Sequence, residues 1–227
     1  LALDLHDTGC VIASDASPAR RKIIRENISR QGLLNVVVTR ASLEDLRDNG
    51  LKVDAALVDA PCSGHERRST KQVHKMAKKQ LRILEQAAAC VRAGGRLVYS
   101  TCTMYYEENE DVIERFLEAH DDWYIETVVI DEIGEDVGIT AQGSVRIWPS
   151  VMRTEPFFAC RLRCRGEAVA KYSNVYTERV ASDLEFTLPD SVFCFRHKQF
   201  LLMCNEESAG IDVPIQSRGL LLAEEID

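Results

Sequence analysis

The feature of this chain that most constrains its fold is the alternation of short apolar runs with longer helical patterns. Runs typical of β-strands occupy residues 9–15, 35–40, 53–59, 96–102, 123–130 and 157–163, and helical patterns occupy residues 18–31, 71–92 and 107–119. Alternating helices and nearly continuous apolar strands are typical of a parallel sheet covered by helices on both faces. We therefore expect an α/β fold.

Two helix ends are marked by particular residues. Ser17 followed by Pro18 favours a helix start, because serine caps free backbone N–H groups and proline suits the first helical position. Gly94 and Gly95 predict the end of the long helix before them, followed by a turn.

Three of the expected strands end in small or polar residues, namely Asp15, Asp59 and Cys102. In an open α/β sheet, ligands bind beyond the carboxyl ends of the strands. We therefore expect these three side chains to converge on one crevice.

The composition, with 45% hydrophobic and 28% charged residues, excludes a disordered tail, a collagen-like repeat and a disulfide-stabilised miniprotein. No apolar run approaches the roughly 18 residues that a membrane span needs. No signal peptide opens the sequence either. We therefore expect a cytoplasmic protein with no membrane partner. Because Leu1 stands within a helix-like run, we also expect the sequence to be part of a longer protein.

The eight cysteines lie mostly within apolar, strand-like runs, as free buried thiols do. The closest pair, Cys160 and Cys164, lies in an alternating segment in which four residues span about 13 Å. Two thiolates so far apart cannot share one tetrahedral zinc ion with bonds of about 2.3 Å. We expect no metal site.

The strand–helix alternation ends near residue 165. Residues 1–165 therefore read as one α/β domain. Residues 166–227 carry short mixed elements and predict part of a small α+β domain at the C-terminal end.

Asp15 has two interpretations. An acidic residue at the end of such a strand often accepts hydrogen bonds from the two hydroxyls of a nucleoside ribose. Aspartate is also a common cap at the start of a helix. Spacing alone leaves both open.

Two cysteines follow the ends of neighbouring strands. Pro61 cannot continue a strand ladder, so the chain breaks beside Asp59 and presents Cys62. Cys102 stands at the end of the next strand, before an acidic run at residues 107–110 that suits the start of a helix. The pair could be buried core or turn residues, or it could include a nucleophile.

A basic run lies between the two cysteine segments, although the formal net charge is −8. Seven basic residues and no acidic one fall within residues 67–82: Arg67, Arg68, Lys71, Lys75, Lys78, Lys79 and Arg82. Concentrated positive charge suits a phosphate backbone. The alternative is a solvated helix face.

The segments VDAPCSG and YSTCTMYYEENE together resemble the two signature motifs of the Sun/Fmu-type RNA (cytosine-5) methyltransferases. SDASPARRKIIRENISRQGL is similar to the ribose-binding segment of that family, and RIWPSVMRTEPFFACRLR to its closing motif. The resemblance covers about residues 1–165. It implies a Rossmann-like methyltransferase sheet that lacks its first strand in this chain, with S-adenosylmethionine as the cofactor.

The resemblance also implies a mechanism. C5 of cytosine is a poor nucleophile, and a thiolate that adds to C6 makes C5 able to attack the methyl group of the cofactor. In this family Cys102 would be that nucleophile, Asp59 would hydrogen-bond the base, and Cys62 would assist release of the product. Asp15 would bind the cofactor ribose, with Asp59 also near the cofactor. The base must leave its stack, which favours structured RNA with loops.

Several features differ from the family pattern. The glycine-rich cofactor loop is absent from this sequence, so we expect these residues alone to bind cofactor weakly. Ser42 stands where the family usually has an aspartate that faces the adenine, and the stretch after Gly64 is shorter and more basic than usual. VPIQSRGLLLAEEID resembles the junction that leads into a PUA-like RNA-binding extension of bacterial ribosomal-RNA members, which favours ribosomal RNA over transfer RNA as the partner.

Two other functions remain open at this point. A non-catalytic RNA-binding or ribosome-assembly factor could use the same scaffold. A cysteine hydrolase would need a histidine near its thiol, for which His65 and His74 are the candidates near in sequence.

Overall fold

The structure is a computed structural model of the 227-residue chain. It describes residues 1–5, 10–64, 68–128, 138–140, 142–152, 154–167, 192–197, 200–205, 215–218 and 220–224. The chain divides into two compact units, one formed by residues 1–46 with 171–227 and the other by residues 47–170.

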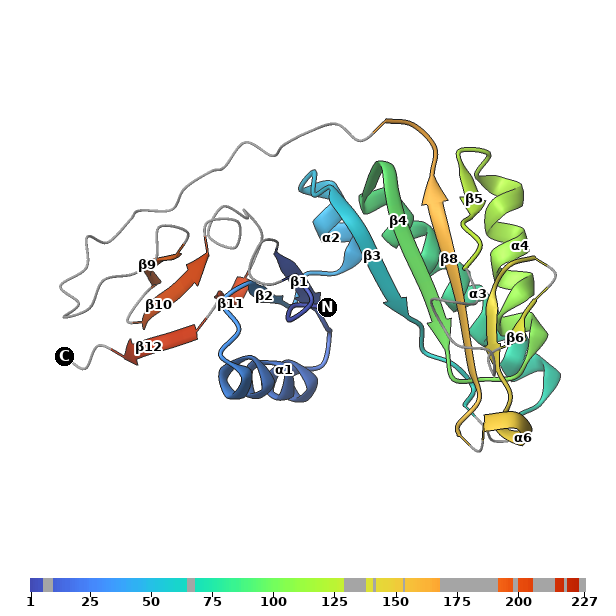
Figure 1. Ribbon diagram of the computed structural model, residues 1–227, viewed down its shortest axis with the longest axis horizontal. Coiled ribbons are helices and arrows are strands. Elements are labelled where there is room, and N and C mark those ends of the chain that lie inside the picture. Colours follow the sequence, from blue (N-terminus) through green and yellow to red (C-terminus); the bar gives the residue numbers. More distant parts are fainter. Residues whose placement is uncertain are drawn as a thin grey trace. The chain divides into compact units, whose positions relative to one another are not determined.

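The first unit contains a parallel β–α–β element (Figure 1). Strand β1 (Val11–Ser14) pairs in parallel with β2 (Val36–Thr39), and helix α1 (Pro18–Gln31) connects them. The helix begins as expected, because the Ser17 side chain caps it and Pro18 is its first residue. Gly32 ends it in the left-handed conformation, at φ 64°. Ile28 of the helix packs on the apolar face of β2.

The remaining strands of this unit come from the C-terminal part of the chain. Strand β11 (Ile215–Arg218) pairs antiparallel with β2. Strands β9 (Val192–His197), β10 (Phe200–Asn205) and β12 (Leu220–Glu224) form a separate antiparallel sheet. The domain boundary expected near residue 165 stays a prediction.

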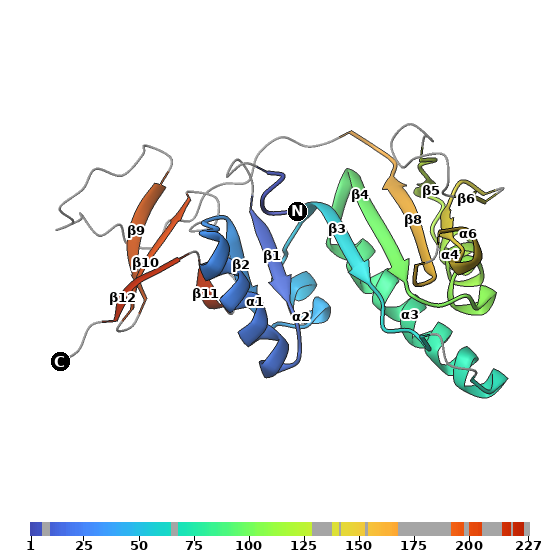
Figure 2. The ribbon, with the colours of Figure 1, turned by 60° about the horizontal axis from the view of Figure 1, so that its bottom comes forward.

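The second unit is built on a mixed sheet (Figure 2). Its strands are β3 (Val53–Asp59), β4 (Val91–Thr101), β5 (Trp123–Ile125), β6 (Gly138–Ile139), β7 (Val145–Ile147) and β8 (Phe157–Cys164). Strands β3 and β4 are parallel, as expected, whereas β8 runs antiparallel to β4 and pairs with β5 and β7. The site described below lies at the carboxyl ends of the parallel pair.

Helices α3 (Thr70–Cys90) and α4 (Glu110–Ala119) pack against each other, and α3 also packs on β3 and β4. The chain also forms short helices at η1 (Tyr106–Glu108), α2 (Leu43–Asp48) and α6 (Pro149–Met152). The buried face of α3 is a stripe at helical spacing, consisting of Val73, Ala77, Gln80, Leu84, Ala87, Ala88 and Cys90. Gln80 is the polar member of this stripe and is fully buried.

The expected boundaries differ from the structure in three places. Strand β5 ends at Ile125, so the strand expected over 123–130 is shorter, and residues 129–130 lie outside the described residues. The acidic run does not simply start a helix, because η1 comes first and α4 begins at Glu110. The third difference concerns the glycine pair.

Gly94 and Gly95 do not end the long helix. That helix ends at Cys90, and the glycines lie within β4, where the pairing with β3 shifts register. Gly94 has a φ of 71°. A Cβ on Gly95 would stand 2.8 Å from the Asp54 carbonyl oxygen, which is too close for any other residue type. The pair therefore makes an irregularity that lets β4 approach β3.

Candidate active site

The site is formed where β3 and β4 end side by side. In the parallel register, Asp59 lies opposite Ser100. The Ala60 N–H donates to the Ser100 carbonyl over 2.9 Å, and the Ser100 hydroxyl donates to Asp59 Oδ1 over 3.4 Å. These contacts fix the exposed Asp59 carboxylate at the edge of the sheet.

Two thiols meet beside this carboxylate. The chain breaks away from the sheet at Pro61, and the Sγ atoms of Cys62 and Cys102 lie 3.0 Å apart. Cys102 is exposed and Cys62 is partly exposed, and both are free thiols. The expected convergence of strand ends is thus confirmed for Asp59 and Cys102. Asp15 belongs to the other unit, so its place in the crevice stays a prediction.

The contact between the thiols changes the acidity of Cys102. The hydrogen bond with Cys62, followed by burial and by the nearby negative charges, raises the pKa of Cys102 to about 11. In the free protein, Cys102 is therefore a protonated thiol at neutral pH. Because the thiolate is the nucleophilic form, this proton must leave when the sulfur reacts.

Alkylation of Cys102 by iodoacetamide is expected to be slow at pH 8, where a pKa of about 11 leaves roughly one thiol in a thousand ionised. The rate should rise about tenfold per pH unit towards pH 10. In Cys62→Ala the hydrogen bond is gone, so the pKa of Cys102 should fall and alkylation at pH 8 should accelerate at least about tenfold. Peptide mass spectrometry measures both rates, and Cys10→Ala is the control. Equal alkylation rates in wild type and Cys62→Ala would contradict the inference that the hydrogen bond with Cys62 raises the pKa of Cys102.

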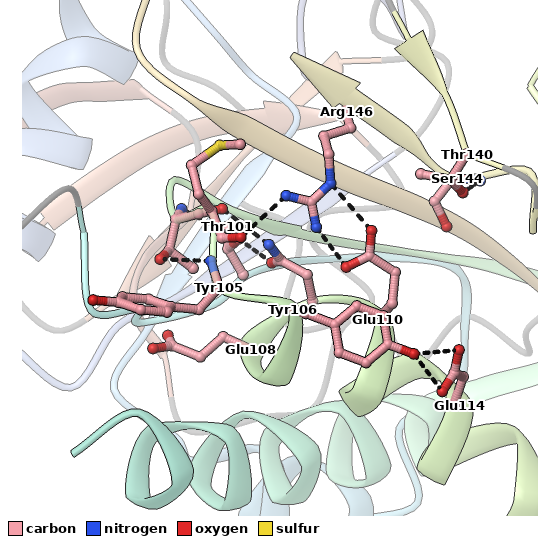
Figure 3. A network of polar contacts seen from close by, with 12 residues as sticks. Thr101, Tyr105, Tyr106, Glu108, Glu110, Glu114, Thr140, Ser144 and Arg146 are labelled. Atoms are coloured by element: carbon pink, nitrogen blue, oxygen red, sulfur yellow. Dashed lines mark hydrogen bonds and ion pairs between the residues drawn. The ribbon is translucent and has the colours of Figure 1, made fainter. Parts of the chain in front are cut away.

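The segment after Cys102 is held by buried polar contacts (Figure 3). Arg146 of β7 donates to Glu110 through Nε and Nη2, over 3.1 and 2.5 Å, and to the Met104 carbonyl through Nη1, over 3.2 Å. The Tyr105 hydroxyl accepts from the Arg68 N–H over 2.8 Å, which connects this segment with the start of α3. The loop that carries Cys102 is therefore attached both to β7 and to the start of α3.

A pocket of about 400 Å³ opens beside Cys62. It is lined by Cys62, Ser63, Arg68, Gln72, Lys75, Met76 and Lys79. The pocket brings together the thiol segment and two of the predicted RNA-binding residues, Arg68 and Lys75. Lys71 is exposed on the same helix but does not line the pocket, and Arg67 lies outside the described residues.

Sequence reasoning did not single out several residues of this site. Lys79, four residues after Lys75, belonged to the basic run, and helical spacing could have placed both on one face. Gln80 stands on the apolar stripe of α3, and a polar residue at such a position is a signal of a buried hydrogen bond. Nothing in the local pattern indicated that Glu108 would be fully buried.

Of the three residues expected near the cofactor, Asp59 lies in the second unit, whereas Asp15 and Ser42 make local contacts in the first unit. Asp15 Oδ1 accepts from the Ser17 N–H over 2.7 Å, and Oδ2 lies 3.5 Å from Arg20 Nη1, as in the helix-capping interpretation. The Ser42 hydroxyl donates to Asp45 Oδ2 over 2.8 Å and accepts from the Asp45 N–H over 3.0 Å at the start of α2. A role of Asp15 and Ser42 in cofactor binding stays a prediction.

The described part of the chain also bears on metal binding and membrane insertion. No group of three or more histidine, cysteine, aspartate or glutamate side chains is placed to hold a metal ion there. No helix among the described residues is both long and apolar enough to cross a membrane. His74 is exposed on α3, and His65 lies outside the described residues.

Comparison with known proteins identifies the relationship. Residues 1–163 match the family described as 16S rRNA methyltransferase RsmB/F. The chain belongs to this family. The resemblance inferred from the two cysteine motifs is thereby confirmed.

Two relatives illustrate how the chain compares with the RsmB/F family. Ribosomal RNA small subunit methyltransferase F from Shewanella amazonensis is 34% identical over 178 residues, which cover 72% of this chain and 38% of that protein. The protein of the same name from Escherichia fergusonii is 32% identical over 182 residues, with 72% and 36% covered. The chain thus spans little more than a third of the length of these relatives.

Solved structures agree with the RsmB/F assignment. A methyltransferase homologue from Pyrococcus horikoshii has a TM-score of 0.64 and 29% identity, covering 72% of this chain and 56% of that one. NSun6 from Pyrococcus horikoshii, in a crystal structure with SFG, has a TM-score of 0.64 and 34% identity, covering 73% and 44%. The expected Rossmann-like α/β fold is confirmed.

Proposed function

We propose that the protein transfers a methyl group from S-adenosylmethionine to C5 of a cytidine in structured RNA, ribosomal rather than transfer RNA. The observation that carries the proposal is the pair of thiols 3.0 Å apart beside Asp59, at the ends of two parallel strands. The names of the relatives, which are ribosomal RNA small subunit methyltransferases, favour ribosomal RNA.

Each residue of the site has a distinct part in this chemistry. The sulfur of Cys102 forms a bond with C6 of the cytosine, and the thiol proton passes to N3 of the base, where Asp59 hydrogen-bonds N3 and the amino group. After methylation, the proton on C5 is released to water and the bond between C6 and sulfur breaks, which restores the double bond of the ring. Cys102 takes back the proton held at N3 and is again a thiol. Cys62 lies within reach of the reacting sulfur and assists this release.

S-adenosylmethionine would supply the electrophilic methyl group. Asp15 fits the ribose of such a cofactor, because its carboxylate stands at the carboxyl end of β1 and its side chain is 22% exposed. Its Oδ2 atom has a contact of 3.5 Å with Arg20, which leaves room to accept a hydroxyl. Ser42 fits less well, because its hydroxyl already both donates to and accepts from Asp45.

The basic pocket beside Cys62 would receive the RNA. Its volume of about 400 Å³ falls in the range of small-ligand sites. Arg68, Lys75 and Lys79 line it, and their positive charge suits the phosphates next to an unstacked base. Lys71 is exposed on the same helix and would add to the positive electrostatic potential that attracts the RNA.

The decisive test uses the full-length protein that contains these residues, carrying Cys62→Ala, with S-adenosylmethionine and cellular RNA. Without Cys62 the methylated intermediate should stall, so a covalent protein–RNA adduct should accumulate. A denaturing gel detects the adduct, peptide mass spectrometry assigns it to Cys102, and sequencing of the trapped RNA identifies the target. Cys62→Ala with Cys102→Ala is the control, and it should give no adduct.

A folded Cys62→Ala protein that binds RNA and cofactor but forms no adduct would contradict the two-cysteine mechanism. A non-catalytic RNA-binding or ribosome-assembly role would then be favoured. The commitment of Ser42 to the capping of α2 is the structural observation that points in that direction.

A further inference from the structure

Two adjacent buried residues connect the backbone around both thiols. Glu108, the last residue of η1, and Asn109, which precedes α4, are both fully buried. The contacts of Glu108 lead to the Cys62 segment, and those of Asn109 lead to the Cys102 segment. The contacts of both residues are with groups beside the thiols, so any effect on the chemistry would act through the position of the segments that carry Cys62 and Cys102.

The backbone around Cys62 is held on both sides. Glu108 Oε2 accepts from the Ser63 N–H over 2.9 Å and from Gln80 Nε2 over 2.8 Å. The same Gln80 nitrogen donates to the Pro61 carbonyl over 2.9 Å. The peptide groups immediately before and after Cys62 are therefore attached to one buried pair, Glu108 and Gln80.

The residues on either side of Cys102 are also held by buried contacts, one through a side chain and one through the backbone. The Thr101 hydroxyl donates to Asn109 Oδ1 over 2.6 Å, and Asn109 Nδ2 donates to the Thr103 carbonyl over 2.9 Å. One side chain thus connects the residues immediately before and after Cys102. Because Glu108 and Asn109 are neighbours in the chain, the two thiol segments are connected through a single peptide bond.

The segment that carries these two residues is itself fixed to the sheet. The hydroxyl of Tyr99, a fully buried residue of β4, donates to the Glu108 carbonyl over 2.6 Å. By contrast, Glu108 Oε1 and Gln80 Oε1 are buried and have no hydrogen-bond partner among the described residues. A buried acceptor without a donor lowers stability, so stability alone does not account for a glutamate at this position.

We propose that Glu108 and Asn109 are positioning residues for the two cysteines. Glu108, together with Gln80, sets the position of Cys62 for release of the methylated base, and Asn109 sets the position of Cys102 for addition to C6. The inference rests on the proposed function, since it assigns one residue to each half of that reaction. Misplacement of a reacting group by about 1 Å is enough to lower a rate about a hundredfold.

The test compares Glu108→Ala and Asn109→Ala in the full-length protein with S-adenosylmethionine and RNA. Glu108→Ala should accumulate the adduct on Cys102, as Cys62→Ala does, because addition proceeds and release is slowed about a hundredfold. Asn109→Ala should form the adduct about a hundredfold more slowly. Because release is not impaired in this variant, no adduct should accumulate. If the two residues had only a structural role, both variants should lose methyl transfer to the same extent, and neither should accumulate the adduct.

Two further variants separate positioning from folding. Glu108→Gln keeps an oxygen that can accept from Ser63 and Gln80, so it should release RNA at nearly the wild-type rate. Glu107→Ala changes the same residue type one position away, where the side chain is partly exposed, and should behave as wild type. Circular dichroism and thermal unfolding show whether each variant is folded.

A second measurement does not depend on RNA. The oxidant diamide takes up one hydrogen from each of two thiols and leaves a disulfide, so the rate at which Cys62 and Cys102 cross-link reports how closely they are held. Wild type and Glu108→Gln should cross-link quickly, and Glu108→Ala and Asn109→Ala at least about tenfold more slowly.

The outcomes distinguish the two proposals. If Cys62→Ala forms no adduct, the proposed reaction fails, and the cross-linking rates still decide whether Glu108 and Asn109 position the thiols. If Cys62→Ala forms the adduct but folded Glu108→Ala releases RNA and cross-links like wild type, the positioning role is overturned.

Discussion

Replacement of Cys102 by alanine is expected to reduce methyl transfer to RNA by at least about a thousandfold, because the sulfur proposed to form the bond to C6 is then missing. The Cys102 side chain is exposed, so its truncation leaves no cavity in the core. RNA binding should be retained, because the cations that line the pocket on α3 are unchanged. Cys102→Ser should be equally inactive, since a hydroxyl ionises less readily than a thiol.

Incorporation of a labelled methyl group into RNA measures this effect in the full-length protein, and a filter-binding assay measures RNA affinity. Cys62→Ala provides the matched comparison, because it removes the partner thiol 3.0 Å away and should bind RNA covalently instead of failing to react. Methyl transfer within tenfold of wild type in folded Cys102→Ala would exclude Cys102 as the nucleophile.

The second large effect concerns stability. Arg146 and Glu110 form an ion pair in which the side chains are only 8% and 9% exposed. Arg146 also donates to the Met104 carbonyl and lies over the rings of Trp148 and Phe158. Arg146→Met would leave the Glu110 carboxylate buried without its cation, which we expect to lower the free energy of unfolding by about 3–5 kcal/mol.

Denaturant unfolding measures this loss. The double variant Arg146→Met with Glu110→Gln should recover much of it, because no uncompensated charge remains buried. Arg115→Met is the matched control. Arg115 pairs with Asp111 on α4, and its side chain is 52% exposed. Exposed ion pairs contribute about 0–1 kcal/mol to stability, so this substitution should have little effect. A loss below about 1 kcal/mol in Arg146→Met would contradict the inference.

Local sequence signals predicted those elements whose ends depend on neighbouring residues. Helix α1 occupies residues 18–31, as expected, because Ser17 and Pro18 define its start and Gly32 its end. Strand β3 occupies residues 53–59, as expected, because its apolar run ends where Pro61 prevents further pairing. The sequence also predicted that the two cysteine segments lie at the ends of neighbouring strands, since each segment follows a strand of the parallel pair.

Signals that depend on contacts between distant residues were misread. Gly94 and Gly95 resembled a helix end, but they lie in an irregularity of β4 that the close approach of Asp54 requires. The acidic run resembled a helix start that complements the macrodipole, but Glu108 points into the core and accepts hydrogen bonds from Ser63 and Gln80. Periodicity carries no information on such partners, because they are 45 and 28 residues away in the chain.

The sequence by itself determined the α/β class and the family, and it pointed to Asp59, Cys62 and Cys102 as the residues of one site, because these depend on short motifs and local periodicity. Only the tertiary structure decided that the thiols of Cys62 and Cys102 lie 3.0 Å apart. It also decided that the residues next to the two cysteines are held by Glu108, with its partner Gln80, and by Asn109. A distance between side chains depends on how the sheet and helices pack, and that packing is the sum of many long-range contacts that no single segment encodes.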